Sequence, residues 1–339
     1  MNKRALITGV EGQDGYYLAR QLTRQGYDVF GIVRKKARHK LEERPDTEEN
    51  YQKIYADMME FSSLYRCVQE ARPDEIYNLA GLSEIPISWK QPTLTAEVNA
   101  VGVLRMLEAL HICAPQARFL QSSTSEIFAP SLAPLDEKSP VATRNPYGSA
   151  KLYGQWITTN YRESYQMFAC SAILFNHESP RRGVDFVTRK ITASATRIVL
   201  GMQDVLELGN LDAVRDWGSA EDYVYAMWLM LQQDAPDDYV IATGEPHTVR
   251  DFVIAAFGVL GVSLAWEGDG FDEVARDRKS GKTLVRVNPA FYRFPREDVI
   301  MGNPAKAREK LGFRPRHTFE GIVEEIVKND LAALTRGRT

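Results

Sequence analysis

Three glycines near the start of the chain constrain its fold more than any other feature. Gly9, Gly12 and Gly15 lie between a short apolar run and a helical pattern, and a second apolar run follows. This order predicts a strand, a tight turn, a helix and a second strand. Glycine lets the backbone approach a pyrophosphate, and a helix N-terminus offers free N–H groups and partial positive charge. The turn, which includes Gln13 and Asp14, is therefore predicted to bind a dinucleotide; a tight turn without a ligand is the alternative.

Strands and helices are predicted to alternate through the first half of the chain. The expected strands lie at 5–7, 27–33, 54–56, 75–81 with its exit turn, 118–126 and 168–174. The expected helices follow the glycine turn and cover 62–71, 93–113 and 146–161. This alternation is typical of an α/β fold with a Rossmann-type, doubly wound parallel sheet.

In the second half of the chain, strands and helices alternate less regularly. After about Phe175 the elements become shorter, and the polar stretch at 267–283 is expected to be a loop. We therefore expect a dinucleotide-binding Rossmann domain over 1–175, completed by part of 210–245. Residues 176–339 are expected to form mainly a smaller, discontinuous C-terminal domain that binds the substrate.

The composition is that of a soluble globular protein, with 44% hydrophobic and 26% charged residues. A net charge of -3 gives no general electrostatic reason to bind nucleic acid. No apolar stretch approaches the roughly 20 residues of a membrane span, and none resembles a signal peptide, so a cytoplasmic protein is expected. Cys67, Cys113 and Cys170 are far apart with no CxxC, which suggests neither a disulfide framework nor a metal site.

The end of the second strand indicates which dinucleotide is preferred. NAD sites often place an acid there, where it binds the ribose 2′-hydroxyl. This chain instead has Arg34 and Lys35, followed by another lysine, which favours the 2′-phosphate of NADP. A solvated basic loop is the alternative. Asp57, after the third strand, is a candidate partner for the adenine amino group, although an ordinary surface aspartate would look the same.

A tyrosine and a lysine four residues apart are the first candidate catalytic pair. Tyr147 and Lys151 follow Pro146, which suits the first turn of a helix, and they share one helix face. An ammonium beside a phenol is expected to lower the pKa of Tyr147 toward a value useful for a general base. The alternative is a tyrosine and a lysine on an ordinary amphipathic helix.

Thr124 and Glu126 form the second candidate pair, at the end of the fifth predicted strand. In an extended chain, residues two apart point the same way, here toward the carboxyl edge of the sheet. A threonine hydroxyl can bond a sugar oxygen, and a carboxylate can remove a proton from carbon. Enzymes that only oxidise or reduce a hydroxyl do not need that carboxylate, so Glu126 points to an elimination. A solvent-facing glutamate after a strand is the alternative.

Several strings of residues resemble a known family. Thr8-Gly9-x-x-Gly12-x-x-Gly15, Asn78-Leu79-Ala80 and Tyr147-x-x-x-Lys151 together resemble the extended short-chain dehydrogenase/reductases. Longer strings resemble the GDP-mannose 4,6-dehydratase family over nearly the whole chain, among them Ser123-Thr124-Ser125-Glu126, Ile173-Leu174-Phe175-Asn176-His177-Glu178-Ser179-Pro180 and Arg215-Asp216-Trp217-Gly218.

The resemblance implies roles for individual residues. It assigns catalysis to Thr124, Glu126, Tyr147 and Lys151. It adds Met58, Leu79 and Ala80 to the cofactor site, to which Tyr147 and Lys151 also belong. It implies a nucleotide-sugar site made by Ser83, Glu84, Ser125, Asn176, Val187, Lys190, Leu208, Gly209, Asn210, Arg215, Arg293 and Glu297, of which Asn176, Val187, Lys190, Arg215 and Arg293 match positions that hold the GDP moiety.

The chain departs from the family at two places. Phe294-Pro295-Arg296-Glu297 replaces a Pro-Ala-Glu-like string, so a carboxylate contact to the nucleotide is shifted or lost. Glu84 is an acid where members vary, which bears on the identity of the hexose. The basic segment 34–40 resembles the arm through which family members form tetramers, so a homo-oligomer, a dimer or a tetramer, is expected.

The expected activity is therefore NADP-dependent dehydration of GDP-mannose, with a hydride moved internally from C4 to C6. An NADPH-dependent 4-keto reductase or an epimerase on the same scaffold would use Tyr147 and Lys151 without Glu126. A catalytically silent NADP-sensing protein would be expected to lack the tyrosine or the lysine, and both are present.

Overall fold

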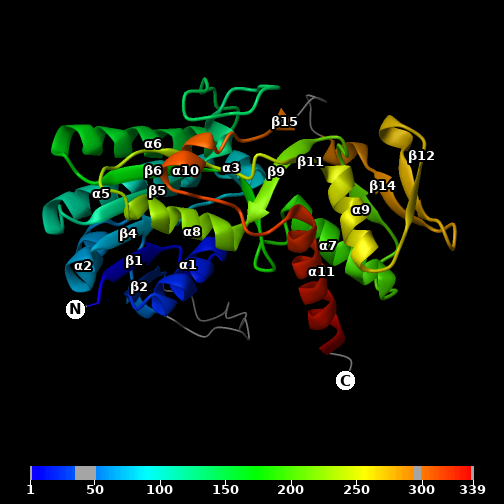
Figure 1. The fold of residues 1–339 in the computed structure, drawn as a ribbon, viewed down its shortest axis with the longest axis horizontal. Coiled ribbons are helices and arrows are strands. Elements are labelled where there is room, and N and C mark those ends of the chain that lie inside the picture. Colours follow the sequence, from blue (N-terminus) through cyan, green and yellow to red (C-terminus); the bar gives the residue numbers. More distant parts are fainter. Residues whose placement is uncertain (1, 35–50, 293–298, 337–339) are drawn as a thin grey trace.

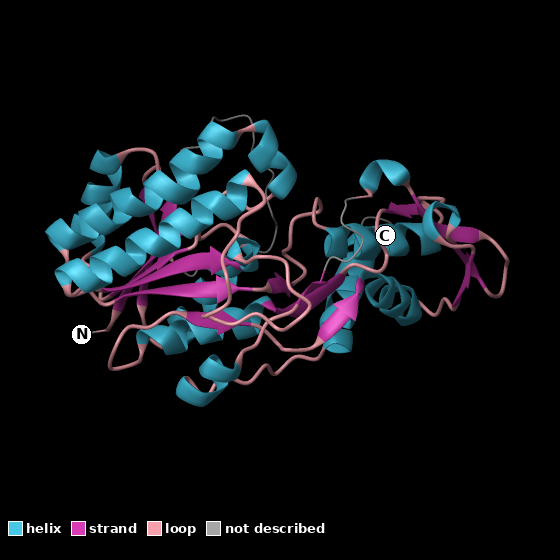
Figure 2. Cartoon of the chain, turned by 90° about the horizontal axis from the view of Figure 1, so that it is seen from above, coloured by secondary structure: helices cyan, strands magenta, loops and turns pink. Residues whose placement is uncertain are grey.

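A computed structural model describes residues 2–34, 51–292 and 299–336. Lys35, Arg293, Glu297 and most of the basic arm lie outside the described residues. The described elements form two groups side by side along the long axis of the molecule (Figures 1 and 2). One group is a sheet between layers of helices, and the other is a smaller set of helices and short strands.

The larger group is built on a seven-stranded sheet. In sheet order its strands are β10 (Tyr239–Ile241), β6 (Ala169–Leu174), β5 (Arg118–Thr124), β4 (Glu75–Asn78), β1 (Arg4–Thr8), β2 (Asp28–Val33) and β3 (Gln52–Tyr55). Every neighbouring pair is parallel. All residues of β4 and β6 are buried, as expected for strands covered on both faces. The predicted α/β class with a parallel Rossmann-type sheet is confirmed.

Helices cover both faces of this sheet (Figure 1). One layer consists of α1 (Gln13–Arg24) and α8 (Ala220–Leu231). The other consists of α2 (Phe61–Ala71), α5 (Gly102–Cys113) and α6 (Pro146–Tyr165). Each layer has its own apolar core against the sheet, and together they hold the carboxyl ends of the strands in fixed positions.

The predicted long helix over 93–113 is confirmed, but it is not α-helical throughout. The segment consists of α4 (Pro92–Ala96), a π-helical turn (Glu97–Val101) and α5 (Gly102–Cys113). The wider turn coincides with an inward contact: the Asn99 amide accepts the N–H of Leu82 at 2.8 Å and donates to its carbonyl at 2.9 Å. Asn99 thereby fixes the chain after β4, and π-helical turns inside helices are frequent near functional sites.

The smaller group has two four-stranded sheets and three longer helices. One sheet has the order β11 (Pro246–Thr248), β9 (Val214–Ser219) and β15 (Val299–Ile300), with β7 (Asn176–Glu178) also paired to β9. The other has the order β12 (Leu264–Glu267), β13 (Val274–Asp277), β14 (Thr283–Val287) and β8 (Leu206–Leu208). The longer helices are α7 (Val187–Val199), α9 (Val249–Val259) and α11 (Phe319–Arg336). Besides α4, the described residues include the short α-helices α3 (Ile85–Lys90) and α10 (Ala305–Lys310).

The expectation of a loop throughout 267–283 is wrong. Four residues of that stretch form β13, which pairs with β12 and β14. Ala275 is fully buried, and Arg276 pairs with Glu267 across the strands at 2.9 Å. A polar strand with one buried apolar residue does not show the apolar alternation by which strands are usually recognised.

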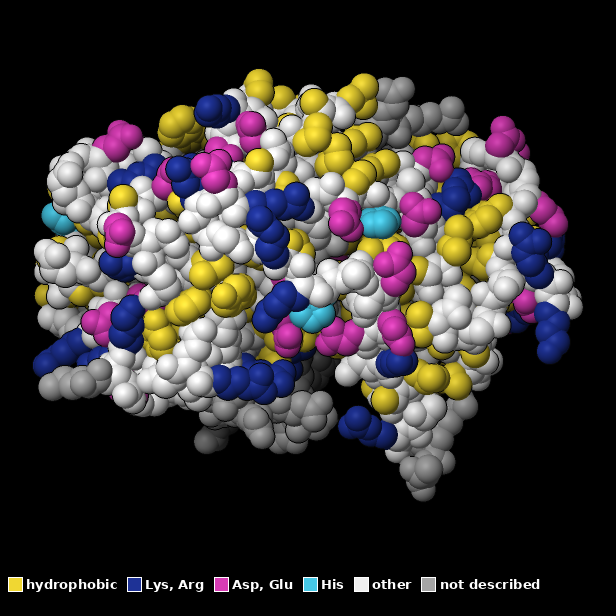
Figure 3. Space-filling model, in the orientation of Figure 1, with side chains coloured by type: hydrophobic (Ala, Val, Ile, Leu, Met, Phe, Trp, Pro, Cys, Tyr) yellow, Lys and Arg dark blue, Asp and Glu magenta, His cyan; other side chains and the backbone are white. Residues whose placement is uncertain are grey.

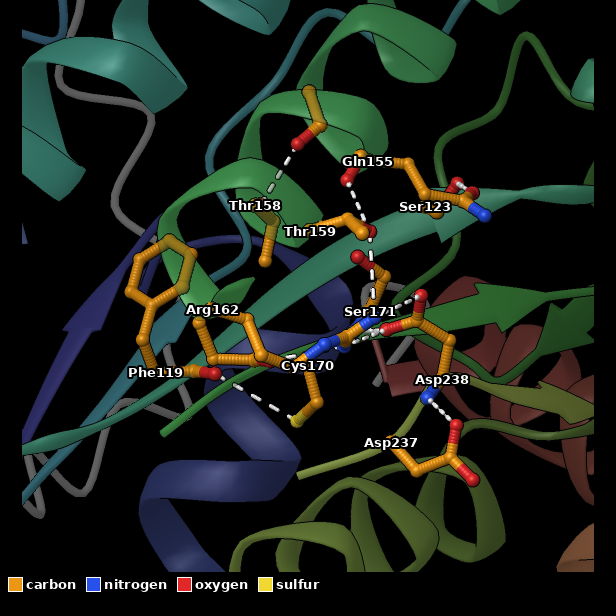
Figure 4. A network of polar contacts seen from close by, with 12 residues as sticks. Phe119, Ser123, Gln155, Thr158, Thr159, Arg162, Cys170, Ser171, Asp237 and Asp238 are labelled. Atoms are coloured by element: carbon orange, nitrogen blue, oxygen red, sulfur yellow. Dashed lines mark hydrogen bonds and ion pairs between the residues drawn. The ribbon is translucent and has the colours of Figure 1, made fainter. Parts of the chain in front are cut away.

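α6 is anchored to the sheet by a network of polar contacts (Figure 4). Arg162 pairs with Asp238 at 2.8 Å, and the same carboxylate accepts the backbone N–H of Ser171 in β6 at 2.7 Å. Ser123 of β5 donates to Gln155 at 2.8 Å. These contacts connect the helix to β5 and β6, so the residues at its N-terminus are carried on a rigid support.

The surface is mixed in charge. On the face drawn in Figure 3, basic and acidic side chains are interspersed, in keeping with 42 basic and 45 acidic residues in the sequence. Among the described helices, none combines the length and the apolar character needed to cross a bilayer.

Candidate active site

A cleft of about 1410 Å³ lies at the carboxyl ends of the strands and extends to the smaller group of elements. This volume exceeds the roughly 300–1,000 Å³ usual for one small ligand, so it can hold a dinucleotide and a nucleotide sugar together. Every predicted site residue within the described part of the chain lines it: Gly9, Gly12, Gln13, Asp14, Gly15, Arg34, Asp57, Met58, Leu79, Ala80, Ser83, Glu84, Thr124, Ser125, Glu126, Tyr147, Lys151, Asn176, Val187, Lys190, Leu208, Gly209, Asn210 and Arg215.

The glycine turn joins β1 to α1 in the form that a pyrophosphate requires. Gly9 has a φ of +68°, and its carbonyl accepts the N–H of Gly12 at 2.9 Å. A Cβ on Gly15 would lie 2.4 Å from the oxygen of Gly9, so that position is closed to any side chain. Gly12 begins α1 without a side-chain cap, which leaves the N-terminal N–H groups to a ligand. This cradle fits a dinucleotide.

Replacing Gly15 with alanine should therefore damage both the turn and ligand binding. The new Cβ would meet backbone atoms, so α1 has to shift, at a cost of about 1–3 kcal/mol in the free energy of unfolding. We expect dinucleotide affinity to fall at least about tenfold, because the N–H groups move with the helix. Denaturant unfolding and a fluorescence titration with the cofactor measure the two effects. Gly258→Ala in α9, where a Cβ meets nothing within 4 Å, is the matched control. Unchanged cofactor affinity in Gly15→Ala would contradict this description of the turn.

Asp14 and His177 form a buried ion pair beneath the turn. His177 Nε2 lies 3.0 Å from both carboxylate oxygens, and its Nδ1 lies 2.8 Å from the Phe175 carbonyl. Burial opposes the charge on Asp14, but His177 lowers the pKa of the carboxyl to about 2. Burial also opposes the charge on the imidazole, and Asp14 reverses that effect and raises the pKa of His177. The pair ties α1 to β7, and the sequence interpretation assigned no role to His177.

Tyr147 and Lys151 lie on one face of α6 and are both buried. Lys151 Nζ donates to the carbonyl of Ser122 at 2.9 Å and to its hydroxyl at 3.1 Å, and lies 5.9 Å from the centre of the Tyr147 ring. Burial raises the pKa of Tyr147 to about 12, an effect that a hydrogen bond with Thr124 opposes. Burial also lowers the pKa of Lys151 to about 8. The expected lowering of the pKa of Tyr147 is therefore wrong for this structure, because burial outweighs the groups that lower it, which are Thr124 and Arg182 rather than Lys151.

Thr124 and Glu126 reach the cleft in a different way from that expected. Thr124 ends β5, but Glu126 lies in a 3₁₀ turn over Ser125–Ile127, so the two are not successive members of one strand face. The Thr124 hydroxyl accepts the N–H of Glu126 at 3.3 Å and thereby begins the turn. This local side-chain bond competes with continued extension. The carboxylate of Glu126 accepts a hydrogen bond from Asn145 at 2.8 Å.

One end of the cleft collects residues from β2, β3 and β4. Asp57 accepts the N–H of Met59 at 2.9 Å, so part of its hydrogen-bonding capacity is used within its own turn. The N–H of Ala80 donates to Thr8 at 2.9 Å, which fixes the chain after β4 beside β1. Arg34 directly follows β2 and lines this end of the cleft.

The opposite end lies in the smaller group of elements. Lys190 of α7 lies 3.9 Å from the centre of the Phe291 ring, and burial lowers the pKa of Lys190. Gly209 is packed so closely that a Cβ there would lie 2.2 Å from the Phe291 carbonyl. Arg215 on β9 donates to the Val214 carbonyl at 2.8 Å. A compact wall with cationic groups is suited to a nucleoside diphosphate.

Several lining residues were not predicted from the sequence. Arg182, Asp185 and Phe186 precede α7, and Phe291 ends a short 3₁₀ turn. Arg182 stacks on Phe186, with its guanidinium 3.7 Å from the ring centre. Burial raises the pKa of Glu84, and the charge of Asp185 adds to this effect. The only sequence signal was the density of Arg, Asp and aromatic residues in the segments after Phe175.

Two solved structures share this fold over nearly the whole chain. RMD from Pseudomonas aeruginosa complexed with NADPH is 20% identical, with a TM-score of 0.77, and the match covers 97% of this chain and 100% of that one. The dTDP-glucose 4,6-dehydratase from Bacillus anthracis in complex with NAD is 19% identical, with a TM-score of 0.78 and 96% of each chain covered. These matches show that the chain has the same fold as both proteins, a Rossmann-type sheet followed by a smaller group of elements.

Comparison of sequences identifies the family. The family model for GDP-mannose 4,6 dehydratase matches residues 6–326. GDP-mannose 4,6 dehydratase 2 of Caenorhabditis elegans is 48% identical over 344 residues, with 98% of this chain and 90% of the relative covered. The chain belongs to the GDP-mannose 4,6-dehydratase family.

Proposed function

We propose that this chain converts GDP-mannose to GDP-4-dehydro-6-deoxymannose and water, with NADP as a recycled hydride carrier. As a family member, the chain is a hydro-lyase that acts on GDP-mannose. The residue roles, the preference for NADP and the internal path of the hydride are our finer proposals. The observation that supports them is that Tyr147, Lys151 and Glu126 line the same cleft as the glycine turn.

The described residues divide the chemistry among them. Tyr147 takes the proton of the 4-hydroxyl as C4 is oxidised, and Thr124 bonds a sugar oxygen. Since burial raises the pKa of Tyr147 to about 12, this role requires that the positive charges of Lys151 and of an oxidised nicotinamide favour the phenolate once cofactor and substrate are bound. A nicotinamide dinucleotide held at the glycine turn would supply the hydride acceptor for C4 and the hydride donor for C6. The C4 ketone acidifies the C5 proton, which Glu126 removes. The C6–O bond then breaks, and the hydroxyl leaves as water with the proton taken up by Glu126. C5 regains a proton when C6 receives the hydride, and this proton balances the one that Tyr147 took from the 4-hydroxyl. The hydride lost from C4 is the one gained at C6, so no external oxidant or reductant is consumed.

We assign the GDP moiety to the end of the cleft in the smaller group of elements. Lys190 and Arg215 supply positive charge for the diphosphate, and Asn176 can bond phosphate or sugar. Apolar surface at this end can pack on the base. The residues concerned, which all line the cleft, are Asn176, Val187, Lys190, Leu208, Gly209, Asn210 and Arg215. Their position supports our proposal that the second half of the chain is mainly the substrate-binding domain.

One incubation tests the activity. The purified protein is supplied with GDP-mannose, with and without added NADP⁺, and the products are analysed by mass. Loss of one water with no net change in reduced nicotinamide is expected. Consumption of NADPH by a 4-keto sugar alone, or an isomer of unchanged mass, would instead indicate a reductase or an epimerase. If another nucleotide sugar is dehydrated while GDP-mannose is returned unchanged, the assignment of base or hexose is wrong.

The cofactor is a nicotinamide dinucleotide, and its 2′-phosphate is assigned to Arg34, with Lys35 next in sequence. Arg34→Glu should weaken NADP⁺ binding by roughly 10–100-fold, the equivalent of one charge-assisted hydrogen bond, and should affect NAD⁺ much less. Dissociation constants of both dinucleotides measure the change. Arg24→Glu, the same charge change on an exposed position of α1, is the control. An equal loss of affinity for NAD⁺ and NADP⁺ would contradict the assignment.

Two further proposals concern the state of the protein in the cell. We infer a homo-oligomer, a dimer or a tetramer, from the basic arm that begins at Arg34, and a cytoplasmic location from the role in nucleotide-sugar metabolism. Light scattering at several protein concentrations tests the first, and fractionation of cells tests the second.

A further inference from the structure

Asn145 connects two parts of the site through one side chain. It immediately precedes α6 and is only 9% exposed. Its Oδ1 accepts the N–H of Gly148 at 2.7 Å, which caps the helix. Its Nδ2 donates to Glu126 Oε2 at 2.8 Å. The same amide therefore begins the helix of Tyr147 and holds the carboxylate of Glu126.

The backbone around this contact is closely packed. A Cβ on Gly148 would lie 2.5 Å from the Glu126 carbonyl oxygen, so the first turn of α6 rests directly on the 3₁₀ turn. The N–H of Glu126 is engaged by Thr124 at 3.3 Å. These contacts fix the backbone of Glu126. The direction of the Glu126 carboxylate therefore depends on contacts of its side chain, and Asn145 makes such a contact.

The chemistry of this contact suits a base. A donated N–H fixes the orientation of a carboxylate and can leave its second oxygen free to accept a proton. The bond engages Oε2, and within the described part of the chain no donor is recorded on Oε1, so one oxygen stays available to the substrate.

We propose that Asn145 is a positioning residue for the dehydration: it aims the Glu126 carboxylate at C5. It also couples that geometry to the helix that carries Tyr147 and Lys151. The inference rests on the proposed role of Glu126, and it assigns to Asn145 a task beyond capping the helix.

Other charged groups around Glu126 shape the expected pH dependence. Tyr147 on α6 is electrostatically coupled to Glu126, and it also responds to Arg182 before α7 and to Asp14 on α1. Lys151 lies one turn further along α6. Substitutions of Asn145 leave all of these groups in place, so a change in the acidic limb of the pH profile reports on the contact with Glu126.

Asn145→Asp is the most direct test, because an aspartate keeps the capping oxygen but replaces the donor with a second acceptor. We expect the acidic limb of kcat to move to higher pH by on the order of one unit. At neutral pH, kcat should fall by roughly 10–100-fold, with KM for GDP-mannose little changed. Asn160→Asp, the same substitution at an exposed position of α6, is the matched control.

Asn145→Ser provides a second variant if the aspartate destabilises the protein. A serine hydroxyl can cap the helix but carries no amide that reaches Glu126, so kcat should fall while the melting temperature stays close to that of the parent. In a single turnover, both variants should accumulate more reduced nicotinamide than the parent, since C4 is oxidised normally and removal of the C5 proton is slow.

Two results would overturn the inference. One is an unchanged acidic limb with kcat within about threefold of the parent. The other is a rise in KM at constant kcat, which would place Asn145 in binding instead. Glu126→Gln is measured in parallel to separate this inference from the proposed function. If Glu126→Gln is active, the role of Glu126 fails; if it is inactive while Asn145→Asp behaves as the parent, only the positioning role fails.

Discussion

Glu126→Gln is expected to lower the rate of dehydration by about a thousandfold, since general-base catalysis contributes roughly 10²–10⁴-fold. Glutamine keeps the size of the side chain and can still meet Asn145, but its amide cannot accept the C5 proton at neutral pH. Oxidation of C4 does not need the carboxylate. The variant should therefore oxidise bound sugar once and stop, with reduced nicotinamide held on the enzyme.

Stopped-flow absorbance measures the reduced nicotinamide that accumulates on the enzyme, and mass analysis of the sugar measures the loss of dehydration. Glu163→Gln, at an exposed position of α6, is the control for the loss of one carboxylate and should retain full activity. Near-normal release of the dehydrated product by Glu126→Gln would remove Glu126 from the role of base.

The parts of the fold that local sequence determines were predictable. Apolar strands joined by a glycine turn require no partner far away in the chain, and β1, α1 and β2 lie where the sequence placed them. Contacts between distant segments were not predictable. The π-helical turn coincides with the contact between Asn99 and Leu82, and β13 is a strand because β12 and β14 pair with it.

In the candidate site, too, some features could be predicted from local sequence and others depend on contacts between distant segments. The glycines, Tyr147 and Lys151 follow a fixed spacing, so their presence in one cleft could be expected from sequence. His177 could not, because its contact with Asp14 joins residues that are 163 positions apart. The direction in which the pKa of Tyr147 is shifted could not be predicted either. The spacing of the two residues reveals the charge of Lys151, but it does not reveal that both side chains are buried.

Tyr147→Phe should stop the reaction one step earlier than Glu126→Gln does. The ring and its packing stay, but the hydroxyl that takes the 4-hydroxyl proton is lost, so we expect kcat to fall by about 10²–10⁴-fold. Without proton removal C4 is not oxidised, and no reduced nicotinamide should appear even in a single turnover. Cofactor affinity should change little, because Lys151 keeps its bonds to Ser122.

Comparison of the two variants is more informative than either alone. Tyr165→Phe, a half-exposed tyrosine at the end of the same helix, is the control and should behave as the parent. If Tyr147→Phe accumulates reduced nicotinamide as Glu126→Gln does, Tyr147 acts after the oxidation of C4 and the order of the two residues has to be reversed. If neither variant does, the two groups share the first step, and the carboxylate is not a separate base for C5.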